Sequence, residues 1–127
     1  MSDIQSHDIR IDVETEFLAE QSEPADDRYV FAYTITITNT GDKGAQLLKR
    51  HWIITDANNQ VQEVKGDGVV GEQPYLQPGT SYRYTSGTIF ETPVGTMEGS
   101  YEMQDDDGDL FDATIPAFGF SRPGALH

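Results

Sequence analysis

The chain has 127 residues, no cysteine, and a formal net charge of −14 from 22 acidic and eight basic side chains. This length predicts a single domain with its own core, and the missing cysteines exclude disulfides, thiolate metal sites and cysteine nucleophiles. The charge argues against nucleic acids and anionic membranes as partners, because both are bound through basic surfaces.

The opening residues, MSDIQSHDIRIDVE, lack the basic segment and apolar run of a signal peptide. No apolar stretch approaches the roughly 18 residues that a membrane span requires. We therefore expect a cytoplasmic protein without a membrane partner. The terminal segments 1–7 and 121–127 are expected to be loose.

Alternation of apolar and polar residues is the main structural signal along the chain. It begins at Ile9–Phe17 and continues in YVFAYTITIT, residues 29–38, where large apolar residues alternate with threonines. Turn-forming residues separate further expected strands at 46–56, 60–65, 81–90, 96–104 and 110–118. About seven short strands predict an all-β, immunoglobulin- or fibronectin type III-like sandwich of two antiparallel sheets.

Two local features support a sandwich. Trp52 is the only tryptophan and lies within an expected strand, which indicates a core position. The segment LQPGTSY, residues 76–82, matches the corner of fibronectin type III domains in which a tyrosine hydroxyl, here of Tyr82, bonds to nearby backbone. However, more strand is expected after this corner than the two strands that follow it in that fold.

The segment VKGDGVVGEQP, residues 64–74, contains the G-x-G-x-x-G spacing at Gly66, Gly68 and Gly71. A dinucleotide-binding loop of this type must open a helix. Pro74 and Pro78 prevent a long helix here, so the Rossmann interpretation fails. A Walker loop is excluded because no G-K-[ST] follows.

A weaker binding hypothesis remains for this loop. Successive backbone N–H groups in a glycine loop can form an anion-binding nest, and Lys65 and Arg50 are the cations expected nearby, whereas Asp67 and Glu72 would repel an anion. Positive φ angles in a tight loop explain the glycines more simply. We favour the structural interpretation and keep a phosphate or pyrophosphate compound as the alternative ligand.

The segment DDDGDLFD, residues 105–112, brings together five aspartates. It does not match an EF-hand, since the residue twelve positions into the loop would be Thr114. Asp-Gly between alternating runs is a strong hairpin signal, so we expect a solvated hairpin tip. Asp105, Asp107 and Asp109 are at most weak candidate ligands for Mg²⁺ or Co²⁺.

Few residues suggest catalysis. Of the three histidines, His7, His51 and His127, only His51 lies in an expected strand, and no Ser-His-Asp or H-E-x-x-H arrangement surrounds it. We therefore expect a protein that is not an enzyme and needs no cofactor.

Residues 8–121 resemble the ApaG family, also called CorD. The motifs that carry the resemblance are R-H-W-x-I-T-D, G-x-G-V-V-G-x-Q-P and Y-T-S-G, beginning at Arg50, Gly66 and Tyr84. The resemblance implies a seven-stranded sandwich and an association with cobalt and magnesium resistance or efflux. It also implies a gene neighbouring a diadenosine tetraphosphate hydrolase. In eukaryotes the domain is appended to F-box proteins and to a polymerase-delta-interacting protein, where it acts like a partner-binding module. The family has no established catalytic residues.

Two functional hypotheses follow. The first is a non-enzymatic sandwich that binds a protein partner through a sheet face or an edge strand, with a homodimer also open. The second is a site for Mg²⁺, Co²⁺ or a phosphate compound at the loop Gly66–Gly71 or the aspartate cluster. An exposed apolar patch would favour the first, and an ion or phosphate held by the loop would favour the second.

Overall fold

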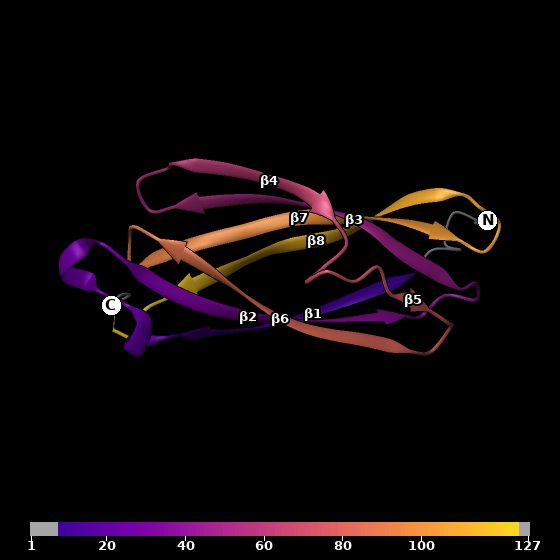
Figure 1. Cartoon of the computed structure of the whole chain (residues 1–127), viewed down its shortest axis with the longest axis horizontal. Coiled ribbons are helices and arrows are strands. Elements are labelled where there is room, and N and C mark those ends of the chain that lie inside the picture. Colours follow the sequence, from indigo (N-terminus) through magenta and orange to yellow (C-terminus); the bar gives the residue numbers. More distant parts are fainter. Residues whose placement is uncertain (1–7, 125–127) are drawn as a thin grey trace.

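The protein is a sandwich of two antiparallel sheets, described for residues 8–124 by a computed structural model. One sheet has the strand order β1 (Ile9–Phe17), β2 (Tyr29–Asn39) and β6 (Ser81–Phe90). The other has the order β4 (Val61–Asp67), β3 (Ala45–Asp56), β7 (Val94–Asp105) and β8 (Leu110–Ser121), with the short strand β5 (Tyr75–Leu76) paired to β3 (Figure 1). Two short 3-10 helices, η2 (Ala19–Gln21) and η3 (Pro24–Asp26), connect β1 to β2.

The predicted sandwich is confirmed, and each of the seven expected strands is present within a few residues of its expected bounds. The two-residue strand β5 was not predicted. Ser121, where a loose tail was expected to begin, still belongs to β8, so the prediction is wrong for this residue. Residues 1–7 and 125–127, where loose ends were expected, lie outside the described part of the chain.

The core lies between the sheets and is rich in aromatic side chains. Trp52 is 3% exposed, which confirms its predicted core position. Its ring lies 5.8 Å from that of Tyr33 in the opposite sheet and 5.9 Å from that of Phe118. Because such contacts join the two sheets, they fix how the sheets pack on each other.

Two buried tyrosines make a polar contact across this core. The hydroxyls of Tyr84 on β6 and Tyr101 on β7 lie 2.5 Å apart, and each is the other's hydrogen-bond partner. Burial, the largest cause, raises the pKa of both phenols above its ordinary value. The pair is therefore neutral at physiological pH.

The corner before β6 differs from the tyrosine corner that was predicted. Within residues 8–124 the hydroxyl of Tyr82 makes no hydrogen bond to the backbone, and its ring lies 6.4 Å from that of Tyr84. The buried side chain of Asn39 instead donates to the carbonyls of Lys43 (2.8 Å) and Leu76 (3.0 Å) and accepts the Gly41 amide (3.0 Å). The expectation of additional strand after the corner is confirmed, since β6, β7 and β8 all follow it.

The two sides of the sandwich differ. On one side β1 lies against β8, which closes the space between the sheets. On the other side the edge strands are β6 and β4, and a groove remains between the sheets. Since three strands face four long ones, β4 is the strand left without a counterpart in the opposite sheet (Figure 1).

Candidate functional site

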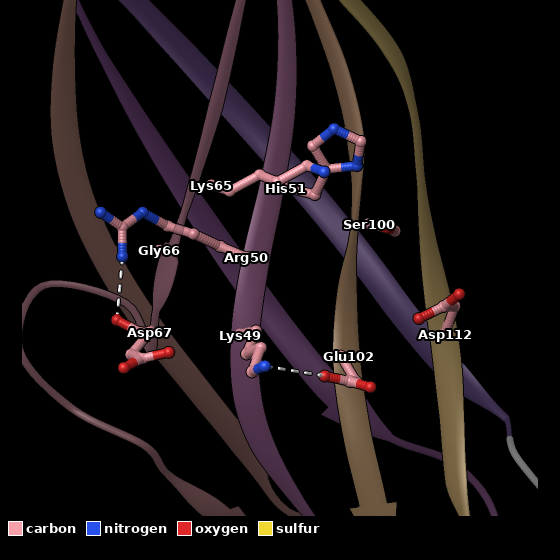
Figure 2. Close-up of a pocket in the computed structure, with 9 residues that line it drawn as sticks. All are labelled: Lys49, Arg50, His51, Lys65, Gly66, Asp67, Ser100, Glu102 and Asp112. Carbon is pink, nitrogen blue, oxygen red and sulfur yellow. Dashed lines mark hydrogen bonds and ion pairs between the residues drawn. The ribbon is translucent and has the colours of Figure 1, made fainter.

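The pairing of β3 with β4 brings three of the predicted site residues together. Arg50 lies opposite Gly66, and Lys65 lies opposite His51. The Nη1 atom of Arg50 donates to the carbonyl oxygens of Asp67 (2.9 Å) and Gly68 (3.0 Å), so the side chain extends across β4 (Figure 2). A Cβ atom at position 66 would lie 2.7 Å from the guanidinium, so a larger residue there would displace the Arg50 side chain.

The other two glycines belong to a tight turn beyond β4. Val69 and Glu72 exchange backbone hydrogen bonds of 2.8 and 2.9 Å. Between them Val70 and Gly71 have φ angles of 48° and 81°, the positive values of a two-residue type I′ turn. Gly68, just before the turn, has φ 64°. The predicted tight loop with positive φ angles is therefore confirmed.

The hydrogen bonds of this turn bear on its capacity to bind an anion. The amides of Gly68, Val69 and Glu72 already donate to backbone carbonyls. Arg50 also faces carbonyl oxygens of the loop rather than a row of amides. This geometry favours the structural role, and anion binding by Gly66, Gly68, Gly71, Lys65 and Arg50 stays a prediction.

Replacing Gly68 by alanine is expected to destabilise the protein far more than replacing Gly71. A Cβ at position 68 would lie 2.3 Å from the carbonyl oxygen of Glu72, whereas one at position 71 has no neighbour within 4 Å. We expect the free energy of unfolding to fall by about 3 kcal/mol for Gly68→Ala and by about 1 kcal/mol for Gly71→Ala. The smaller loss reflects only the cost of a positive φ for alanine, without a steric clash. Urea unfolding of both variants measures the difference, and equal losses would contradict this account of the loop.

A shallow hollow of about 430 Å³ lies on the sheet next to this loop. Three basic side chains line it with His51, but acidic ones stand among them: Lys49 lies 4.0 Å from Glu102, and Lys65 lies 3.8 Å from Glu63. His51 Nε2 lies 2.5 Å from Glu63. The lining residues are Lys49, Arg50, His51, Lys65, Gly66, Asp67, Ser100, Glu102 and Asp112 (Figure 2).

This hollow is a surface of mixed charge. Its ion pairs are exposed, so each contributes little stability. Figure 2 shows Arg50 pointing away from the Lys49–Glu102 pair, toward Asp67. The basic side chains therefore do not converge on one point, as those of an anion site would.

The aspartate cluster forms the turn between β7 and β8, as the hairpin prediction required. Carboxylate oxygens of Asp105, Asp107 and Asp109 lie within 4.8 Å of one another. The tip is not wholly solvated, because Asp105 is buried and its Oδ1 accepts the amides of Asp107 (2.9 Å) and Asp109 (3.0 Å). The ammonium of Lys43 lies 2.6 Å from Asp107, and this hydrogen bond raises the pKa of Lys43. Metal binding here stays a prediction.

A larger groove, of about 550 Å³, runs along the free edge of β6 toward the inner face of β4. Its lining combines buried core residues, among them Trp52 and Tyr33, with the more exposed Val64 and Ile89 and two arginines, and none of the lining residues is acidic. The residues are Gln21, Arg28, Val30, Tyr33, Arg50, Trp52, Ile54, Gln62, Val64, Ser86, Gly87, Thr88, Ile89 and Met97. We call this hollow the β6 groove.

Apart from Arg50, the residues of the β6 groove were not predicted from the sequence as a site. The available signal was the stretch YTSGTIF, residues 84–90, which has no charged residue in a strongly acidic chain. Within residues 8–124 no helix is long and apolar enough to cross a membrane.

Comparison with known proteins gives consistent matches. The family model described as the ApaG domain matches residues 19–105. A protein from Thiobacillus denitrificans named Protein ApaG is 58% identical over 127 residues, which is 100% of both chains. A crystal structure of a Bordetella pertussis protein described as ApaA has a TM-score of 0.90 and 47% identity, covering 93% of this chain and 96% of that one. A structural genomics X-ray structure has a TM-score of 0.89 and 52% identity, covering 94% and 90%.

Proposed function

The chain belongs to the ApaG family, and from this premise we propose that it is a non-catalytic, cytoplasmic module that binds a protein partner in the β6 groove. The observation that carries the proposal is the composition of this groove, whose lining combines the partly exposed Ile54 and Val64 with Arg28 and Arg50. Arginine is enriched in protein interfaces, whereas acidic residues and lysine are depleted from their centres.

Two further observations support a surface for a protein rather than a pocket for a small molecule. Ile89 lines the groove and is 52% exposed, although it is a large apolar residue. Within residues 8–124, every buried side-chain nitrogen or oxygen has a hydrogen-bond partner. Partner binding therefore accounts for the exposure of Ile89, which the fold alone does not require.

The proposal also includes the cobalt and magnesium resistance that the family resemblance implies. Under this proposal, the chain influences metal resistance through its partner. The aspartate cluster would then contribute, at most, weak Mg²⁺ or Co²⁺ binding.

Site-specific photo-crosslinking in cells tests the proposal. We expect p-benzoylphenylalanine at Ile89, in the groove, to give covalent adducts of one or a few discrete masses. Leu110 on β8 provides the matched control, because it is also apolar and exposed, at 58%. Adducts in neither variant, or the same adducts in both, would contradict the proposal.

A second measurement addresses the small-ligand alternative. Amide chemical shifts of the labelled protein are followed during titration with Mg²⁺, Co²⁺ and pyrophosphate. Shifts that saturate at micromolar ligand around residues 64–72 would favour a site at the glycine loop. Millimolar changes confined to residues 105–109 would leave partner binding as the function.

A further inference from the structure

The free edge of β6 lacks the features that prevent unwanted strand pairing. Its segment Tyr84–Phe90 contains no charged residue and no proline, and its pairing with β2 has no bulge. Proteins protect exposed edges with charges, prolines, bulges or very short strands. An unprotected edge of this length is a template for another strand.

The other edge strands within residues 8–124 are protected. Charged residues recur along β1 and β4, and β8 combines an aspartate and a proline with an irregular pairing to β7. The residues concerned are Arg10, Asp12, Glu14, Glu16, Glu63, Lys65, Asp67, Asp112 and Pro116. Since Arg83 is the charged residue of β6, the absence of protection is specific to its segment Tyr84–Phe90.

The sandwich also has room for one more strand beside β6. The sheet β1–β2–β6 is one strand short of the sheet it faces, and β4 is the strand without a counterpart. Val64, which is partly exposed, lines the groove at this place. A strand added to β6 would cover it and extend the smaller sheet to four strands.

The charges of the groove indicate what this strand should carry. Two of the five arginines of the chain line the groove, and none of its 22 acidic residues does. Arg28 makes no ion pair with any residue in 8–124. Arg50 uses only Nη1 for its hydrogen bonds to the loop, so its guanidinium has further N–H groups to donate.

We propose that an extended segment of a partner protein pairs with the free edge of β6 as a fourth strand, and that this segment combines apolar side chains with acidic ones. The inference rests on the proposed function and specifies the chemistry of the partner. A second copy of this chain fits less well, because it would bring another net charge of −14 to the contact.

A synthetic peptide tests the occupant. The probe is the blocked heptapeptide Val-Thr-Glu-Thr-Val-Thr-Glu, whose valines and glutamates share one face of a strand; its binding is followed by fluorescence anisotropy. We expect affinity to fall at least about tenfold when both glutamates are replaced by lysine, and as much when alternate backbone nitrogens are methylated. Equal affinity for all three peptides would overturn the proposal.

Hydrogen exchange distinguishes strand pairing from other binding in the groove. In an antiparallel edge, alternate amides point away from the sheet. We therefore expect the peptide to slow exchange at every second amide of residues 84–90, because the amides that face β2 are already protected. Binding without this alternation would overturn strand pairing but leave the proposed function in place.

A pair of variants locates the interaction. Ile89→Glu should weaken peptide binding at least about tenfold, since it removes an apolar contact and repels the acidic segment. Leu110→Glu makes the same chemical change on β8 and should leave the affinity unchanged. Equal effects of the two variants would overturn the location.

The remaining outcomes separate this inference from the function on which it rests. Crosslinks from Ile89 without peptide binding would overturn the acidic strand and keep the groove as a partner site. Alternate protection of β6 in concentrated protein without peptide, together with dimers in sedimentation, would make a second copy the occupant. Neither crosslinks nor peptide binding would overturn both.

Discussion

The protein is expected to lose stability steeply above pH 10, and Tyr84 and Tyr101 are the main cause. Both phenols lie in the core, where burial raises their pKa. In the unfolded chain they ionise near pH 10. Between the unfolded and the folded pKa, only the unfolded state releases these protons, so rising pH favours unfolding.

The size of this effect follows from proton linkage. Each tyrosine that stays protonated in the folded state costs about 1.4 kcal/mol per pH unit above 10. At pH 11.5 the two together remove about 4 kcal/mol of the stability present at pH 7. This is a large share of the 5–15 kcal/mol that is typical of small domains.

The double variant Tyr84→Phe/Tyr101→Phe tests this explanation. Urea unfolding at pH 7 should show a small change, because both partners of the hydrogen bond are removed together. At pH 11.5 the variant should be more stable than the parent by about 4 kcal/mol. If parent and double variant lose equal stability between the two pH values, the loss arises elsewhere.

The single variant Tyr101→Phe serves as the control for the pair. It leaves the hydroxyl of Tyr84 buried without its partner, which should cost about 1–3 kcal/mol at pH 7. A single variant as stable as the double variant would show that the hydrogen bond contributes nothing.

Replacing Gly99 by alanine is expected to disrupt the larger sheet. Gly99 lies on β7 opposite Trp52, and a Cβ there would lie 1.9 Å from the carbonyl oxygen of His51. Backbone atoms cannot move away by a rotamer change, so the strands β3 and β7 would have to separate locally. We expect a loss of more than about 4 kcal/mol, above the usual range for overpacking by small groups.

Gly119→Ala on β8 is the matched control for this prediction. A Cβ there would lie 3.8 Å from its nearest neighbour, the carbonyl oxygen of Gly95, which is an ordinary contact. Its effect should stay below about 1 kcal/mol. Thermal unfolding of both variants measures the contrast, and similar melting temperatures would show that the strands tolerate the added atom.

The strands could be predicted because alternation is a local property of the sequence. Residues 29–38 alternate in a way that only a half-buried strand explains, and Trp52 could be assigned to the core from its place in such a run. Strand β5 could not be predicted, since two residues contain no period and β5 pairs with β3 across about thirty residues.

The candidate site was harder to predict because it depends on strand order. Alternation does not reveal that β6 and β4 become edges of opposite sheets, and so it could not bring Arg28 near Trp52. The glycine spacing matched that of a ligand-binding loop, but a spacing does not show where the backbone amides point. The amides of Gly68 and Val69 turned out to be used within the backbone.

The order of strands along the chain also determines when the protein can fold during synthesis. Only β1–β2, β3–β4 and β7–β8 pair with their immediate neighbours in sequence. The partner of β2 is β6, and the central partner of β3 is β7. In a nascent chain that ends before residue 81, β2 and β3 both lack a partner strand and only about half of the core is present. Its hydrophobic surface therefore stays exposed until the last third of these residues has left the ribosome. Such long-range pairing places the chain among slow-folding all-β domains, with folding times on the order of milliseconds to seconds, and makes the incomplete chain dependent on protection from aggregation.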